Sequence, residues 1–246
     1  NAGYTFQIDP PRVMSDPPRN FTSYDERNPV GSYRRRFTVP KAWAGRRIFV
    51  TFDGVDSAFF LWVNGRKIGY SVNSKNPAEF DITAEVRPGE SNLLAVEVWR
   101  YCAGSYLEDQ DKWRLSGITR NVTLWSAEPV RIRDYSVRTE LDGVRGDATL
   151  AVTAWVRNDG TAPAPARRLE VALHAPDGRA VGGARGGADV PALAPGEERE
   201  VALRVAVASP ARWTAETPVL YTTVLALAAD AKTGDRLSCR TGFRQV

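Results

Sequence analysis

The side chains best suited to chemistry gather in one connection, the stretch GSYLEDQDKWRLSGITR at residues 104–120. In an extended backbone successive side chains alternate, so Asp109 and Asp111 would point to one side and Glu108 and Gln110 to the other. Two carboxylates that face a common point suit a hard cation such as sodium, magnesium or calcium. Acids at the rim of a sugar pocket can also accept hydrogen bonds from adjacent hydroxyls.

The same stretch has a purely structural interpretation. Its acids could pair with Arg114 or Arg120 and simply fix the loop, which is how most acid-rich turns behave. Trp113 could offer a ring face to a sugar, or it could pack beside Leu115 and pin the loop. These alternatives stay open on spacing alone.

A complete catalytic set is not expected in this chain. Glycoside cleavage needs two carboxyl groups on opposite sides of a bond, and Asp109 and Asp111 lie too close together on one short loop for that. The single histidine, His174, falls in a distant strand-like run, which excludes a Ser-His-Asp arrangement. We therefore assign no catalytic residue.

The segments that must position this loop are typical of short β-strands. No long stretch has helical period, and Asn64-Gly65 suits both central positions of a type I′ turn, which predicts a tight hairpin. Residues 3–31 lack periodicity and are expected to form an irregular arm. Short strands with long polar loops predict a jelly-roll sandwich. The strand-like runs lie at 33–39, 47–52, 58–63, 67–70, 92–100 and 121–125.

A composition shift near Glu128-Pro129 predicts a second domain. Six or seven further strand-like runs there favour an immunoglobulin-like sandwich. The glycine-rich stretch at 182–187 is expected to be a flexible loop, which could also reach across a subunit boundary. The predicted fold class is thus all-β: a jelly-roll (galactose-binding-like) sandwich at 1–128, arm included, followed by an immunoglobulin-like β-sandwich at 129–246.

Composition excludes some function classes. The formal net charge of +4 is spread along the chain, which disfavours nucleic acid as a partner. No apolar run approaches the roughly 20 residues that a membrane helix needs. Cys102 and Cys239 are expected to be buried thiols without a disulfide. Arg35 shares a predicted strand face with Tyr33 and Phe37, so it must either snorkel to water or meet an acid from another domain.

Several segments resemble one enzyme family. The runs are ERNPVGSYRRRF, FDGVDSAFFLWVNGRKIGYSVNSKNPAEFDIT, LAVEVWR, SYLEDQDKWRLSGITRNVTL, ARWTAETPVLYTTVLAL and the final GFRQV. Together they are similar to the first two domains of the large bacterial β-galactosidases of glycoside hydrolase family two. The resemblance covers the chain from about Phe21 onward, and DQDKWRLSGI is typical of the galactosidase branch rather than of the glucuronidases and mannosidases.

The resemblance implies a role at the active site of a larger enzyme. It implies that the chain is the non-catalytic N-terminal part of an enzyme that hydrolyses terminal β-D-galactosyl residues, and that it ends where a catalytic (β/α)₈ barrel carrying both glutamates begins. Asp111 then corresponds to an aspartate that contacts galactose and ligates a monovalent cation. Asn28 corresponds to the substrate-contacting asparagine of an NPxG motif, although this chain has NPVG where NPTG is expected.

The resemblance also sets expectations for the complete enzyme. They are Na⁺ at the active site, Mg²⁺ in the absent barrel, a galactoside substrate, the barrel of the same chain as a partner, a homotetramer and a cytoplasmic location. This fragment is expected to need neither ion by itself.

Two other functions remain possible from the sequence. The chain could be a stand-alone carbohydrate-binding module, since jelly rolls bind sugars and this one carries aromatic residues such as Trp62, Trp99, Tyr101, Tyr106 and Trp113. Against it, Trp62 and Trp99 lie within strand patterns and are expected to pack inside. A pure interaction scaffold, whose acidic loop is indifferent to sugar, is the third possibility.

Overall fold

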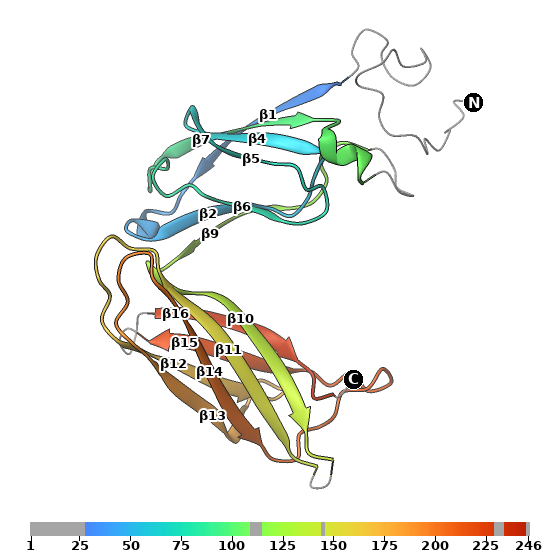
Figure 1. The fold of residues 1–246 in the computed structure, drawn as a ribbon, viewed down its shortest axis with the longest axis vertical. Coiled ribbons are helices and arrows are strands. Elements are labelled where there is room, and N and C mark those ends of the chain that lie inside the picture. Colours follow the sequence, from blue (N-terminus) through green and yellow to red (C-terminus); the bar gives the residue numbers. More distant parts are fainter. Residues whose placement is uncertain (1–27, 109–114, 144–145, 229–233, 245–246) are drawn as a thin grey trace, which may run out of the picture. The chain divides into compact units, whose positions relative to one another are not determined.

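The computed structural model describes residues 28–108, 115–143, 146–228 and 234–244. Contacts divide the chain into two compact units, unit 1 (Asn1–Ser126) and unit 2 (Ala127–Val246). Both are built from strands, and the helices described are two short 3₁₀ turns, η1 (Lys41–Trp43) and η2 (Ala103–Tyr106) (Figure 1). The predicted all-β class, with two successive sandwiches, is confirmed.

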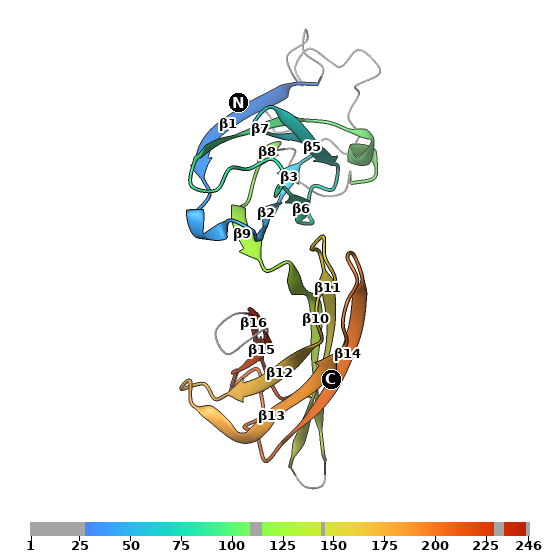
Figure 2. The ribbon, with the colours of Figure 1, turned by 90° about the vertical axis from the view of Figure 1, so that its left-hand side faces the viewer.

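Unit 1 stacks a four-stranded sheet on a three-stranded sheet (Figures 1 and 2). The first has the order β1-β7-β4-β5 and the second has the order β6-β2-β9. A short pair, β3 with β8, lies beside them. The strands are β1 (Val30–Thr38), β2 (Arg47–Phe52), β3 (Val55–Asp56), β4 (Ala58–Val63), β5 (Arg66–Ser71), β6 (Ala78–Asp81), β7 (Ser91–Trp99), β8 (Gly117–Ile118) and β9 (Val122–Ala127).

Alternation along β4 builds the core of unit 1. Phe59 and Leu61 are buried between the sheets, and the Phe59 ring lies 4.8 Å from that of Phe52 on the facing sheet. The predicted hairpin is confirmed, because Asn64 and Gly65 join β4 to β5 with φ of 48° and 83°. Both residues have the positive φ that a type I′ turn requires.

The two strand tryptophans do not pack inside. Trp62 and Trp99 are half-buried on the outer face of the four-stranded sheet. Side chains alternate along each strand, and the preceding residues, Leu61 and Val98, point into the core. The Trp99 indole donates to the Glu97 carboxylate at 2.8 Å on that outer face. The prediction that these tryptophans pack inside was therefore wrong, because it assigned them to the inward-facing positions of their strands.

Unit 2 pairs a three-stranded sheet, β10-β11-β14, with a four-stranded sheet, β13-β12-β15-β16. Regular alternation in β11 and β15 points every second side chain into a shared core. The Tyr221 hydroxyl accepts a hydrogen bond from the amide of Ala211 at 2.9 Å, which holds the loop before β15. The strands are β10 (Val130–Leu141), β11 (Ala148–Asn158), β12 (Arg167–His174), β13 (Ala180–Val190), β14 (Glu198–Val207), β15 (Tyr221–Ala228) and β16 (Gly234–Thr241).

The glycine-rich stretch at 182–187 is not a loop. It lies inside β13, which pairs with β12 along most of its length. A Cβ at Gly186 would lie 2.9 Å from Val205, and one at Gly187 would lie 2.9 Å from Arg168. Gly186 and Gly187 therefore let β13 lie close to these side chains, which is a packing role, whereas a Cβ at Gly182 or Gly183 would have nothing within 4 Å.

The expectation for the cysteines needs adjustment. Cys102 and Cys239 are free thiols, but both are half-buried rather than buried. No helix in the described part of the chain is long and apolar enough to cross a membrane.

Candidate functional site

One end of unit 1 brings together the segments that the sequence singled out. Val30 at the start of β1 and Ala58 at the start of β4 both pair with Trp99 at the end of β7. The chain then leaves β7 into the loop that leads to the acidic stretch. Asn28 and this loop are therefore neighbours, although they are far apart in sequence.

Asn28 holds the beginning of that loop. Its Nδ2 donates to the Tyr101 carbonyl at 3.0 Å, and its Oδ1 accepts from the Tyr101 amide at 2.9 Å. The Arg100 amide adds a bond to the Pro29 carbonyl at 3.1 Å. Because an asparagine amide has two donor hydrogens and two acceptor lone pairs, these bonds orient the side chain and still leave one of each for another partner.

Glu108, the first acid of the stretch, turns inward. Its Oε2 accepts a hydrogen bond from the Ser74 hydroxyl at 2.6 Å, and that hydroxyl also lies 3.5 Å from the Asp56 carboxylate. Ser74 and Asp56 are 2% and 8% exposed, so the contact is shielded from water. A short, shielded bond to a carboxylate is among the stronger hydrogen bonds in proteins, so Glu108 fixes the start of the acidic segment.

The far flank of the acidic segment is fixed at the same place. Gly117 in β8 pairs with Asp56 in β3, and the Thr119 amide donates to the Gly54 carbonyl at 3.1 Å. Arg120 donates to the carbonyls of Lys75 and Asp53 at 3.1 and 3.4 Å. In the described part of the chain, Arg120 thus holds backbone carbonyls instead of the acids that the structural alternative assigned to it.

Residues 109–114 lie outside the described residues, so Asp109, Asp111, Trp113 and Arg114 stay predictions. The contacts that hold the chain immediately before and after residues 109–114 are, however, described: Glu108 bonds to Ser74, and Gly117 pairs with Asp56. The structure thus brings Asn28 and both ends of the Asp111 segment to one end of the sandwich.

Two leucines beside the acidic segment are unusually exposed. Leu107 is 85% and Leu115 is 67% exposed, the highest values among the large hydrophobic side chains described. Our reading of the sequence missed Leu107 and treated Leu115 only as packing. The available signal was the type of residue, because aliphatic side chains are out of place in a polar loop. Exposed apolar groups beside a charged segment favour contact with another protein surface.

No metal site is seen at this end of unit 1 within the described residues. The polar side chains described at the base of the segment include Asp56, Ser74 and Glu108. In the described ranges no group of three His, Cys, Asp or Glu side chains is arranged to hold a metal. The predicted cation ligand, Asp111, falls outside those ranges.

A second polar and aromatic surface covers the outer face of the four-stranded sheet. Phe60 stacks on Tyr70 across β4 and β5 with ring centroids 5.5 Å apart, and Trp62 lies 6.0 Å from Phe60. Lys67 places its Nζ 4.1 Å from the centre of the Phe60 ring. This surface offers ring faces, although the lysine already occupies one of them.

Comparison with known proteins gives consistent matches over both units. Residues 11–128 match the model of the glycosyl hydrolases family 2 sugar binding domain, and residues 130–244 match the model of glycosyl hydrolases family 2. A β-galactosidase of Priestia megaterium is 43% identical over 230 residues, which cover 93% of this chain and 22% of that protein. A β-galactosidase of Psychromonas ingrahamii is 38% identical over 247 residues, covering 100% of this chain and 23% of the relative.

Solved structures share the fold of the two units. A β-glucuronidase from Bacteroides uniformis has a TM-score of 0.77 at 25% identity and covers 88% of this chain and 26% of its own. A family 2 member from Bacteroides cellulosilyticus has a TM-score of 0.76 at 29% identity, with coverage of 87% and 28%. The chain spans less than a quarter of the length of the curated relatives named above. The chain belongs to glycosyl hydrolase family 2, and its two units match that family's sugar binding domain and the domain that follows it.

Proposed function

We propose that the chain is the non-catalytic N-terminal part of a β-galactosidase that hydrolyses terminal β-D-galactosyl residues. In this proposal Asn28 and Asp111 complete an active site whose two catalytic glutamates lie in a barrel elsewhere in the polypeptide. The observation that carries it is the shared anchoring of Asn28 and both flanks of the Asp111 segment at one end of unit 1. Leu107 and Leu115, exposed beside that segment, suit burial against such a barrel.

The choice of galactosidase over glucuronidase depends on sequence. The two relatives named β-galactosidase are 43% and 38% identical to the chain, whereas the β-glucuronidase structure is 25% identical. A TM-score of 0.77 with the glucuronidase reflects domains that the family shares. The fold therefore supports the family, and the higher identity supports the galactoside as substrate.

A side chain that recognises a sugar hydroxyl by hydrogen bonding must be held in a fixed orientation. The two bonds to Tyr101 fix the Asn28 amide, so its remaining hydrogen and lone pair can meet a sugar hydroxyl with little loss of conformational entropy. The Asp111 carboxylate would accept hydrogen bonds from hydroxyls and would ligate Na⁺. When bound, that ion would supply a fixed positive charge that orients hydroxyl oxygens. A site built this way rejects an epimer because a misplaced hydroxyl leaves its polar groups unpaired.

The remaining properties of the complete enzyme belong to the same proposal. Mg²⁺ would bind in the barrel, and this chain contributes no described ligand to it. The barrel would be the partner of unit 1, the enzyme would assemble as a homotetramer, and it would act in the cytoplasm.

The test uses the full-length polypeptide and nitrophenyl β-galactoside. We expect Asp111→Asn to lower kcat/KM by about 100-fold or more, since a lost charged hydrogen bond is worth about 3 kcal/mol. The matched control is Asp177→Asn, an exposed turn carboxylate of unit 2 that is paired with Arg179. The 246-residue chain alone should show no turnover. Turnover by the isolated chain, or cleavage of β-glucuronides but not β-galactosides by the full-length protein, would overturn the proposal.

The stand-alone carbohydrate-binding module is kept as a second candidate because of the outer-face aromatics Phe60, Trp62 and Tyr70. Calorimetry with galactose and lactose on the 246-residue chain separates the two functions. Micromolar binding that Trp62→Ala abolishes and Trp125→Ala leaves unchanged would favour the module. If no heat of binding is detected at millimolar sugar, the result would favour the N-terminal part of a β-galactosidase over the stand-alone module.

A further inference from the structure

The sandwich of unit 1 is closed on one side and open on the other. On the closed side β5 and β6 meet, and the Phe80 ring packs 5.8 Å from Phe59. A Cβ at Gly69 would lie only 2.8 Å from Phe80, so the two sheets are in close contact there. On the opposite side, between β1 and β9, the sheets do not meet in this way.

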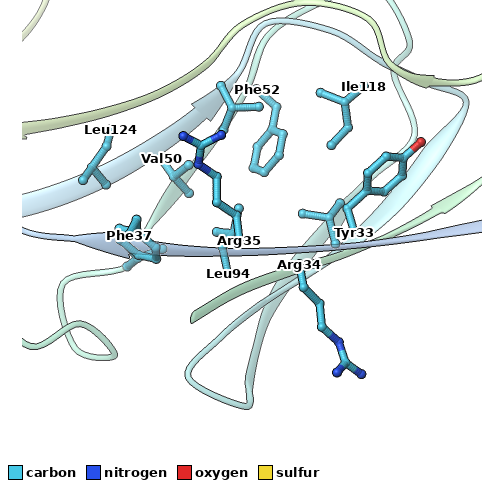
Figure 3. A pocket seen from close by; sticks show the side chains of 12 residues that line it. Tyr33, Arg34, Arg35, Phe37, Val50, Phe52, Leu94, Ile118 and Leu124 are labelled. Carbon is cyan, nitrogen blue, oxygen red and sulfur yellow. The ribbon is translucent and has the colours of Figure 1, made fainter. Parts of the chain in front are cut away.

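A cavity of about 580 Å³ opens between β1 and β9 (Figure 3). Its walls are mainly apolar and come from both sheets and from β8. Tyr33 and Val122 at its rim are 43% and 42% exposed. The walls include Phe37, Val50, Leu94, Val96, Ile118 and Leu124. Val50 and Val96 at the base of the cavity are buried core residues, whereas Phe37, Leu94, Ile118 and Leu124 are only partly buried and would gain cover from an occupant.

The strands that border the cavity also have free edges. β9 is the last strand of the three-stranded sheet and β1 is the last strand of the four-stranded sheet. Within the described residues, neither has a strand partner on its outer side. A free edge presents a row of backbone donors and acceptors, and an extended segment can pair with it. The three-stranded sheet thus has room for one strand more, at the place where the apolar walls are uncovered.

Arg35 adds a charge to this apolar cavity. Figure 3 shows its side chain directed between the sheets, near Val50 and Phe52, whereas the neighbouring Arg34 points away. None of the residues that line the cavity is acidic, and no ion pair of Arg35 is found within the described ranges. Arg35 is exposed in the described chain, so water can solvate its guanidinium, but an occupant of the cavity would remove that water, and a carboxylate would offset the cost. The cavity therefore suits an occupant that carries an acid.

We propose that a further β-strand, supplied by a part of the same polypeptide outside residues 1–246, pairs with the free edge of β9. Its apolar side chains, at alternate positions, fill the space between the sheets, and one carboxylate meets Arg35. The inference rests on the proposed function, because that function makes the chain part of a longer polypeptide. It goes beyond it by assigning a structural partner to a cavity whose lining includes neither Asn28 nor Asp111.

A second copy of the chain fits this face less well. A symmetric dimer would bring the same patch of both copies together and set one Arg35 near the other. The cavity lining contains no acid to compensate that charge. A strand of the same polypeptide has no such conflict and is held at a high local concentration by its covalent connection.

The first test compares amide hydrogen exchange in the full-length polypeptide and in the 246-residue chain. We expect the amides of β9 to exchange at least 10-fold more slowly in the full-length polypeptide, because a partner strand would pair with the exposed edge. Amides of β11, in the middle of a sheet of unit 2, serve as the internal control and should not differ. Equal exchange of β9 in the two forms would contradict the proposal, as would protection that appears only as protein concentration rises.

Paired variants provide an independent test. Val122 at the cavity and Val72 beyond β5 are 42% and 40% exposed, so glutamate should be tolerated equally at both in the 246-residue chain. In the full-length polypeptide we expect Val122→Glu to lower the thermal midpoint of unit 1 and Val72→Glu to leave it unchanged. Arg35→Met should likewise speed β9 exchange in the full-length form, whereas Arg34→Met should not. Equal effects within each pair would overturn the proposal, and no readout depends on galactosidase activity.

Discussion

The two units share a two-sheet architecture but differ in how completely their hydrophobic cores are covered. In unit 2 the buried side chains of both sheets form one cluster that extends from β10 to the last described strand, and β13 closes on β14. In unit 1 the cluster stops at the cavity beside β1 and β9. The described core of unit 2 is therefore continuous across its two sheets, whereas that of unit 1 borders an open cavity.

Side-chain amides hold loops in both units. Asn158 of unit 2, 1% exposed, bonds to three backbone groups of its own loops. Asn92 of unit 1, also 1% exposed, holds the turn before β7 in the same way. The half-buried Asn28 of unit 1 instead bonds to Tyr101, in the loop that leads to the acidic segment.

The largest expected difference concerns the cores. Leu150→Ala removes a fully buried side chain of unit 2 and should lower the free energy of unfolding by about 3–5 kcal/mol. Leu94→Ala at the open cavity should cost less than about 1.5 kcal/mol in the 246-residue chain, because water already reaches its surroundings. Denaturant titration followed by circular dichroism measures both. Equal losses would mean that the open side of unit 1 is as well packed as the core of unit 2.

The asparagine contacts give the next largest effect. Asn158→Ala should destabilise unit 2 by about 2–3 kcal/mol, since it leaves several buried backbone groups unpaired. Asn28→Ala should cost about 1–2 kcal/mol and should speed hydrogen exchange at residues 100–108. Exchange mass spectrometry resolves the two regions. If Asn28→Ala also speeded hydrogen exchange throughout unit 2, the local role assigned to Asn28 would be contradicted.

A smaller and more local effect is expected at Ser74. Ser74→Ala removes the hydroxyl that bonds Glu108, which should cost about 1 kcal/mol and free the start of the acidic segment. Limited proteolysis should then cut near residues 104–117 faster than in the unmodified chain. Ser238→Ala, on the exposed side of β16, is the control and should leave the cleavage rate as it was. No change in cleavage would show that the segment is held by other contacts.

The smallest effect is a dependence on pH in unit 2. The hydrogen bond from Arg133 holds the pKa of the Glu198 carboxyl below its ordinary value. A carboxyl with a lowered folded-state pKa adds stability above its ordinary pKa near 4.5, and this contribution is lost as the pH falls through the lower, folded value. We expect Glu198→Gln to flatten the acid limb of the stability curve by about 0.5 kcal/mol. Arg133→Gln, which removes the hydrogen-bond donor, should flatten that limb by a similar amount, and a full acid limb in either variant would contradict the assignment.

Sequence reasoning was most successful where local chemistry decides the structure. Asn64-Gly65 specified its hairpin because few residue pairs adopt positive φ at two successive positions. The all-β class followed from period-two alternation. The glycine-rich strand β13 was misassigned because glycine content predicts flexibility unless a close neighbour such as Val205 is known.

Features that depend on the meeting of distant segments could not be predicted. The convergence of Asn28, Ser74 and Glu108 requires the register of β1, β4 and β7. The outward direction of Trp62 depends on which face of β4 is covered, which the alternation of the strand does not decide by itself. For Arg35 the sequence did indicate a conflict between charge and face, but the open cavity that explains it is formed by both sheets together.

The two anchors at Asp56 have a consequence for how this loop could diverge. Glu108 is tied to Ser74 beside Asp56, and Gly117 is paired with Asp56 itself, so the intervening stretch is attached to the scaffold at both ends. Neither of these ties is made by a side chain of residues 109–114. Under the proposed function, we expect substitutions in that stretch to keep both ties, which makes it a suitable target for directed evolution of substrate choice.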